Sequence, residues 1–310
     1  MFTSVYSPII LSFLLGQPMT SPAKTFEIYR YQLLPITDKI QLSLGIPEET
    51  SINSIEELTA KKNSILQGTI TSPKFHVYSR HSHVNMRVEG ENEAVIIFRM
   101  AAKRSARIFS EDFKKKDIPN WPNCWIIMNN DPLVQKIAIE KNPYAFYSTH
   151  AVAEILLESI NKRLQRYQLN IYIDRLKQNA EFWDTIKKYR DRITWLRFEL
   201  ISPNMSNLDG KLSINLRELL IKMKIDSNSH RTSLEFNSPN KGTLRIEKSN
   251  DLIKSAVEYM GEGLGESQIR IKNLKKKIQT TESTREIEIE EVILDGNAQF
   301  IADEFRKLLQ

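Results

Sequence analysis

The chain of 310 residues contains a single cysteine, Cys124, so it cannot form an internal disulfide. Cys124 lies within the apolar run 121–128, next to Trp125. These surroundings predict a buried structural thiol rather than a reactive one. A chain without disulfides also fits a reducing, cytoplasmic location.

Long apolar segments are lacking as well. The run 9–15 resembles the core of a signal peptide, but no Lys or Arg precedes it and it is far too short to span a bilayer. Met19 opens a polar stretch that is typical of the start of a cytosolic protein. We therefore expect Met19 to be the natural start and residues 1–18 to be a non-native or disordered leader.

Neither sign of charge dominates the sequence. Lys and Arg number 44 against 38 Asp and Glu, which gives a net charge of +6. Residues 1–150 carry 17 basic and 14 acidic side chains, and the remaining residues carry 27 and 24, so neither half is a basic domain. Such an even excess permits contact with nucleic acid or an acidic surface without requiring it. With 41% hydrophobic and 26% charged residues, the composition is that of a soluble globular protein.

No motif identifies an enzyme, and no Ser/His/Asp or Cys/His set can be assembled. The glycines of 261–265 follow a predicted helix and precede a predicted strand, the reverse of a phosphate-binding loop, so they predict a helix C-cap and turn. Glu27, Glu199 and Glu247 lie on predicted strands without the Glu-x-Lys pattern of a nuclease, and we interpret them as solvent-facing charges. We expect no cofactor, and a non-enzymatic role is favoured.

Histidines offer one candidate for half of a metal site. His81 and His83 would point to the same face of a strand, because side chains two residues apart share a face. Further ligands would have to be His76, His150 or carboxylates that nothing in the sequence singles out. Exposed strand histidines are the favoured interpretation, so no metal is expected.

The hydrophobic periods predict an α+β protein of two domains. Residues 19–145 are expected to form a mostly β N-terminal domain. An alternating pattern rich in aromatic residues predicts its first strand at 26–34, and further strands are predicted at 74–80, 85–89, 94–100, 125–129 and 134–140. One helix is opened by the capping box of Ser54 and Glu57. Residues 146–310 are expected to form an α+β C-terminal domain that begins with a long helix capped by Ser148 or Thr149.

Within the second domain, residues 192–295 show the clearest order of elements. Strand 195–201 is followed by a helix over 212–223, strands at 233–237 and 243–247, a helix capped by Ser249, and a strand at 269–272. This order, an opening strand and then helix, strand, strand, helix and strand, is that of a split βαβ unit. We therefore predict a ferredoxin-like fold for this segment.

Basic clusters are the most suggestive functional feature. They comprise Lys103, Arg104 and Arg107; Lys114, Lys115 and Lys116; Lys187, Lys188, Arg190 and Arg192; and Arg270, Lys272, Lys275, Lys276 and Lys277. The last cluster flanks a predicted strand, so its lysines could reach phosphates while the strand fixes their register. Because aromatic residues are scarce around it in the sequence, contact with a duplex backbone is favoured over single-strand stacking. We therefore expect Arg270, Lys272, Lys275, Lys276 and Lys277 to bind nucleic acid.

Part of the sequence resembles a known family of proteins. The relevant elements are the segment 121–131, the hairpin and long helix after it, and the later βα region with Pro203 at a strand end. Their layout resembles that of bacterial anti-phage proteins of the lambda Rex A and Kiwa B kind. The resemblance covers about residues 121–295 and rests on the order of elements. It implies a cytoplasmic, dimeric, non-enzymatic DNA-binding sensor that works with a second, membrane-bound protein.

The leading hypothesis is a bacterial defence protein that acts as a sensor or accessory subunit and binds nucleic acid. Duplex DNA is favoured over RNA as its ligand, and a homo-oligomer is expected. Two alternatives stay open. The chain could be a metal-dependent nuclease of a defence system, or a non-catalytic subunit that binds only another protein.

Overall fold

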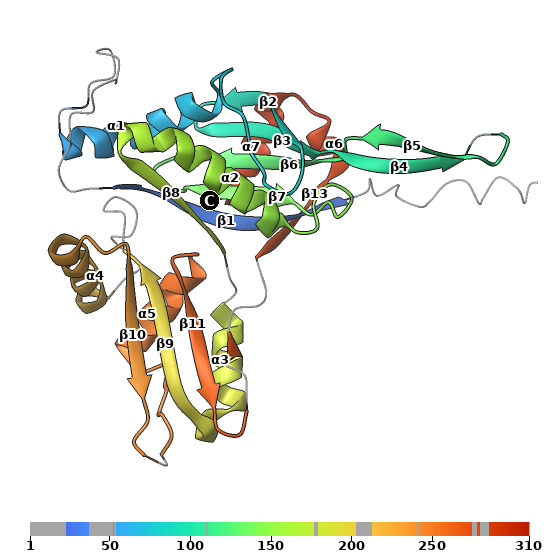
Figure 1. Cartoon of the computed structure of the whole chain (residues 1–310). Coiled ribbons are helices and arrows are strands. Elements are labelled where there is room, and N and C mark those ends of the chain that lie inside the picture. The colour runs from blue at the N-terminus through green and yellow to red at the C-terminus, as the bar shows by residue number, and fades with distance from the viewer. Residues whose placement is uncertain are drawn as a thin grey trace, which may run out of the picture.

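The computed structural model describes residues 23–36, 52, 54–109, 111–176, 179–202, 213–240, 242–274, 278–279 and 285–309 (Figure 1). The expected leader 1–18, the expected start at Met19 and three of the expected nucleic-acid ligands, Lys275, Lys276 and Lys277, lie outside these ranges. Helices and sheets are mixed, which confirms the α+β class. No helix in the described ranges is both long and apolar enough to cross a bilayer.

A seven-stranded sheet forms the body of the first domain. Its strand order is β13-β1-β7-β6-β3-β2, and β8 also pairs with β1. The bounds are β1 (Ala23–Pro35), β2 (Val84–Asn92), β3 (Val95–Ala102), β6 (Asn123–Asn129), β7 (Lys136–Glu140), β8 (Leu169–Arg175) and β13 (Glu286–Glu290). The long aromatic strand predicted at the start of the chain is therefore part of the centre of this sheet.

Helices cover both faces of this sheet. On one face, α1 (Ile55–Ile70) and α2 (Thr149–Leu164) pack over Tyr29, Tyr31 and Leu33 of β1. On the other face, α6 (Glu291–Leu294) and α7 (Ala298–Leu309) belong to a second core with Phe26 and Ile28. Because side chains alternate along β1, one set packs in the core under α1 and α2, and the other set packs in the core under α6 and α7.

The second domain is inserted into the edge of this sheet. β8 pairs with residues 29–35 of β1, and β13 pairs with residues 23–27, both antiparallel and both on the edge opposite β7. The two strands follow one another along β1, and where they meet the Arg285 N–H donates to the Leu176 carbonyl at 2.8 Å. The chain between them leaves the sheet and forms the lower body in Figure 1.

The inserted domain is a four-stranded sheet with helices on one face. Its bounds are α3 (Asn179–Lys188), β9 (Ile193–Ile201), α4 (Ile214–Ser227), β10 (Arg231–Asn237), α5 (Asp251–Gly261), β11 (Gly265–Ile271) and β12 (Ile278–Gln279). The strand order is β10-β9-β11-β12. Leu196, Phe198 and Leu200 of β9 face the helices, and Arg197 and Glu199 lie on the opposite, more exposed face.

The two domains do not divide between residues 145 and 146, where the sequence predicts their boundary. Helix α2 and strand β8, which are expected in the second domain from the sequence, pack in the first core. Strand β13 and helix α7 also return to the first domain. Hydrophobic periodicity predicts helices and strands, but it does not show that β8 and β13 share one edge of β1.

The ferredoxin-like order is not confirmed. Residues 243–247 form no strand, and β10 is the direct antiparallel neighbour of β9. The alternating apolar residues of 243–247 have another cause. Ile246 is buried in the second domain's core, and the Leu244 N–H donates one hydrogen bond to the Ile193 carbonyl at 2.7 Å. Residues 74–80 are likewise not a strand.

Several local predictions are confirmed. The Glu57 N–H donates to the Ser54 hydroxyl at 3.1 Å, and Ser148 rather than Thr149 caps α2. Helix α5 ends at Gly261, and β11 starts at Gly265, so the glycines form a helix end and a turn. Cys124 is buried, and burial raises the pKa of its thiol.

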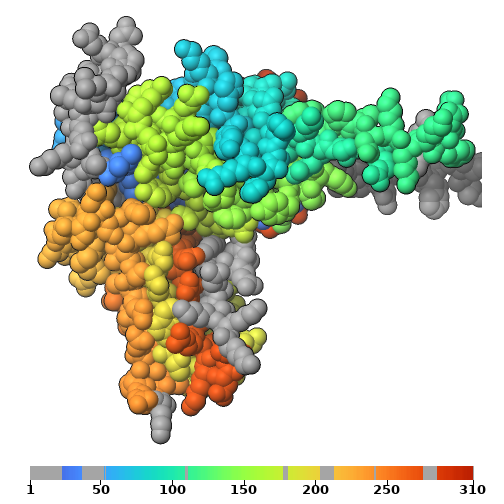
Figure 2. Space-filling model, in the orientation of Figure 1, coloured from blue at the N-terminus to red at the C-terminus, as the bar shows by residue number. Residues whose placement is uncertain are grey.

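A third, two-stranded sheet stands apart from both bodies. It pairs β4 (Arg104–Phe109) with β5 (Lys115–Asn120) and projects from the first domain (Figures 1 and 2). We call the segment 103–120 the arm. The hydrophobic periods do not predict these strands.

Candidate nucleic-acid interface

The two described members of the predicted site lie at one end of the inserted domain. Arg270 is exposed near the end of β11, and exposed Lys272 follows that strand. The Lys272 N–H donates to the Arg192 carbonyl at 2.7 Å, and the Arg192 guanidinium donates back to the Lys272 carbonyl at 2.9 Å. These bonds join the end of β11 to the start of β9.

The structure thereby brings together two basic clusters that lie about eighty positions apart in the chain. We call this end of the domain the distal basic surface, since the opposite end contacts the large sheet. Its cations are Lys187, Lys188, Arg190, Arg192, Lys248, Arg270 and Lys272, all exposed. Asp184, Asp191, Glu235 and Glu247 lie among them, and Arg190 approaches Glu247 at 3.7 Å. Cations outnumber carboxylates on this surface.

Aromatic rings lie beneath several of these cations. Lys248 stands 5.5 Å from the centre of the Trp183 ring, and Lys188 stands 5.3 Å from that of Tyr189. The Arg270 guanidinium lies 5.5 Å from the Trp195 ring, which is itself buried. Rings hold such cations at the surface by cation–π attraction and leave them charged. Because α3 supplies Trp183 and β9 supplies Trp195, their proximity to Lys248 and Arg270 could not be found from sequence neighbours alone.

A shallow groove of about 430 Å³ lies on the same surface. Trp183, Lys187 and Arg190 from the α3 region form one side, and Lys248 lies on the other. The Trp183 ring is half-buried and Lys248 stands over it, so the groove offers cations for phosphates rather than an open stacking face. The groove therefore suits a phosphate backbone.

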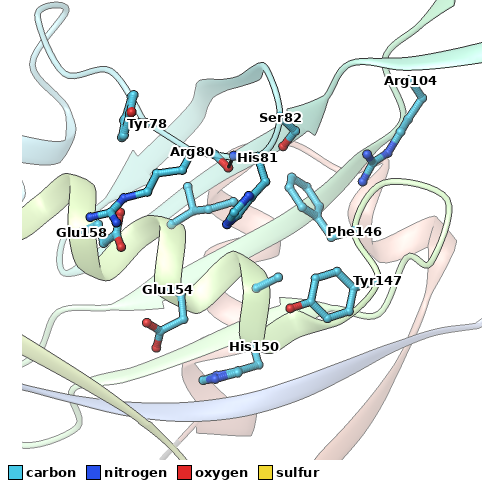
Figure 3. Close-up of a pocket in the computed structure, with 13 residues that line it drawn as sticks. Tyr78, Arg80, His81, Ser82, Arg104, Phe146, Tyr147, His150, Glu154 and Glu158 are labelled. Carbon is cyan, nitrogen blue, oxygen red and sulfur yellow. Dashed lines mark hydrogen bonds between the residues drawn. The ribbon is translucent and has the colours of Figure 1, made fainter.

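A second concave site lies on the first domain (Figure 3). This cleft of about 360 Å³ is bounded by residues 78–82, the start of α2 and the side chains of Phe146 and Tyr147. Arg80, Arg104, Glu154 and Glu158 place both signs of charge around it. The mixture favours no single anion or cation.

Two of the histidines considered as metal ligands lie in this cleft. His81 and His150 both line it, and His81 lies between Arg80 and Phe146 (Figure 3). His81 and His83 are exposed as expected, but they precede β2 rather than lying in a strand. No group of three His, Cys, Asp or Glu side chains in the described ranges is placed to hold a metal ion.

The strand carboxylates are engaged in ion pairs. Glu199 pairs with Arg197 at 3.1 Å and with Arg231 at 3.3 Å. Glu27 is buried rather than solvent-facing, and its carboxylate accepts a hydrogen bond from the Thr149 hydroxyl and lies 3.7 Å from Arg175. These contacts give Glu27 and Glu199 structural roles in the two sheets.

The chain matches no protein-family model, no curated protein and no solved structure.

Proposed function

We propose that this protein binds nucleic acid through the distal basic surface by contacts with the phosphate backbone. The observation that supports this most strongly is the paired hydrogen bonding of Arg192 and Lys272, which joins two separate basic clusters into one surface. Backbone contacts supply most of the sequence-independent affinity of nucleic-acid-binding proteins, and they come mainly from Lys and Arg.

In this proposal, the cations on each side of the groove and Arg270 contact different phosphates. Lys187 and Arg190 lie at the end of α3 and bind phosphates on one side of the groove, while Lys248 binds on the other. Arg270 is held against Trp195 on the face of the sheet opposite the helices, which extends the contact along β11. A duplex backbone is the favoured ligand, with DNA ahead of RNA.

The wider role that we propose is a sensor or accessory subunit in bacterial anti-phage defence, active as a homo-oligomer and alongside a second defence protein. Its support is the resemblance in element order over residues 121–295. A plaque assay on cells that carry the gene and its neighbours would test it, and equal phage titres with and without the gene would contradict it.

The binding proposal is tested by fluorescence anisotropy on a labelled 30-base-pair DNA duplex across a salt series. Joint replacement of Lys187, Arg190, Arg270 and Lys272 by alanine should weaken binding at least tenfold and lower the salt slope by about 0.9 for each phosphate that the variant no longer binds. A second variant replaces Lys275, Lys276 and Lys277 by alanine and should act in the same direction.

The matched control replaces four exposed cations elsewhere, Lys61, Lys74, Arg87 and Lys307. Its affinity and slope should stay near those of the unmodified protein. Equally weakened binding in both quadruple variants, or unchanged binding in both, would contradict the proposal. Cleavage of the probe that depends on Mg²⁺ would instead favour the nuclease alternative, and a lack of both binding and cleavage would favour the protein-interaction subunit.

A further inference from the structure

The arm is a free β-ribbon. Strands β4 and β5 pair in register from Arg104 opposite Asn120 to Phe109 opposite Lys115, and in the described ranges they form no ladder with any other strand. Six residues per strand at about 3.3 Å each give a ribbon roughly 20 Å long. Figure 2 shows that it extends well beyond the first domain.

The base of the arm is fixed to the first domain. The Lys103 N–H donates to the His83 carbonyl at 2.8 Å, and the Ala102 N–H donates to the Pro122 carbonyl at 3.1 Å. The Arg104 guanidinium donates to the Ala145 carbonyl at 2.7 Å. These bonds set the direction in which the ribbon leaves the body.

The ribbon carries excess positive charge along its length. Lys115 lies opposite Phe109 and Lys116 lies opposite Ile108, so the two lysines project from opposite faces of the ribbon. Both are exposed. The full set of charges is Lys103, Arg104, Arg107, Lys114, Lys115 and Lys116 against Glu111, Asp112 and Asp117, of which Arg107 and Asp117 pair at 3.2 Å.

The tip presents a bulky apolar side chain to solvent. Phe113 is 88% exposed, and its backbone has φ of 56°, an uncommon conformation for a non-glycine residue. Ile108, further down the ribbon, is 44% exposed. An isolated two-stranded ribbon is only marginally stable in water and gains nothing for its own fold from these exposed groups.

We propose that the arm enters a groove of duplex nucleic acid, with lysines on both faces of the ribbon contacting the two flanking backbones and Phe113 acting as a wedge against the bases. The major groove of B-form DNA admits a two-stranded ribbon, and apolar side chains inserted between base steps kink a duplex. The positive charge complements phosphate and disfavours an apolar protein partner. This inference rests on the proposed function and makes duplex nucleic acid its ligand class.

The experiment uses the full chain and a 30-base-pair DNA duplex that carries dyes at both ends and one 2-aminopurine, together with the matching single strand. Phe113→Ala should keep the affinity for the duplex within about threefold but abolish the rise in energy transfer and in 2-aminopurine fluorescence that signals a kink. Joint replacement of Lys114, Lys115 and Lys116 by alanine should weaken duplex binding about tenfold and single-strand binding less.

Leu133→Ala is the matched control, because Leu133 is also apolar and highly exposed, but lies at the turn between β6 and β7. It should leave affinity and kinking unchanged. The thermal unfolding midpoint should be the same for all of these variants, since neither the arm nor Leu133 belongs to the three cores.

The inference and the proposed function fail in different ways. If the distal variants bind weakly while the arm variants bind and kink the duplex as the unmodified protein does, the inference is overturned and the function stands. If the unmodified protein binds neither probe, the function itself is overturned. Dissociation of a dimer in Phe113→Ala, without a change in DNA binding or kinking, would make the arm a contact between copies and would also overturn the inference.

Discussion

Lys62 is a buried cation whose titration affects the stability of the fold. It lies on α1 and is 2% exposed, and burial, with Lys224 as a smaller contribution, lowers the pKa of its ammonium from 10.5 to about 8. The folded state therefore releases this proton at a lower pH than the unfolded chain does. Between pH 8 and pH 10.5 the unfolded chain holds more protons, so Lys62 makes stability rise with pH across that range.

We expect Lys62→Met to remove this rise. At pH 7 the substitution should increase the free energy of unfolding by about 1–3 kcal/mol, because the folded state no longer has to bury a charged ammonium. Urea unfolding at pH 7, 8, 9 and 10 measures both effects. Lys61→Met is the control, since Lys61 is exposed and pairs with Glu57 at 2.7 Å. A Lys62→Met profile parallel to that of the unmodified protein would contradict the assignment.

At the scale of the element, helix α5 shows how a boundary depends on one side chain. The sequence predicts Ser249 as its cap, but Asn250 holds that position, and its side-chain oxygen accepts from the N–H groups of Leu252 at 3.1 Å and Ile253 at 3.2 Å. Both residues are good caps by type, so only the backbone path distinguishes them.

The two neighbouring substitutions make a matched pair. Asn250→Ala should cost about 1 kcal/mol in the free energy of unfolding, because two N–H groups at the start of α5 lose their acceptor. Ser249→Ala should change it by less than about 0.5 kcal/mol, as for other exposed positions. Denaturant midpoints at constant slope compare them, and a larger destabilisation by Ser249→Ala would reverse the assignment.

Elements with a strong period can be predicted from the sequence, and those without one cannot. The aromatic alternation of β1 and the capping box of α1 are local signals, and both elements form as expected. Strands β4 and β5 carry exposed charges on both faces, so no half-buried pattern exists to find. The basic clusters are visible in the sequence, but their partners are not, because Trp183 and Lys248 meet only after folding.

At the scale of the whole molecule, two domains are joined by polar contacts as well as by the chain. Arg30 of β1 pairs with Glu262 after α5 at 3.2 Å, and the rings of Tyr172 and His230 stack at 5.0 Å. Gly263 has φ of 75°, and a Cβ placed there would lie 3.0 Å from the Cβ of Arg30. The interface is close but polar, as between domains that keep separate cores.

Excision of the inserted domain tests this description. Replacing residues 178–283 by a short Gly-Ser linker should leave a first domain that unfolds in one cooperative step, because the Leu176 carbonyl and the Arg285 N–H already meet at 2.8 Å. Circular dichroism during heating provides the measurement. The intact chain with Glu262→Ala serves as a comparison that loosens the interface without removing a core. A non-cooperative melt of the excised protein would show that the first core depends on the second domain.

The shared edge of β1 also sets an order of events during synthesis. Ala23 of β1 pairs with Glu290, so β1 leaves the ribosome with part of one edge open until the inserted domain has been translated. At about 5–20 residues per second, that wait is on the order of tens of seconds. Phe305 of α7 then closes over Phe26, with ring centres 5.3 Å apart. A premature stop codon near residue 285 would therefore spare the inserted domain and leave the amino-terminal sheet incomplete.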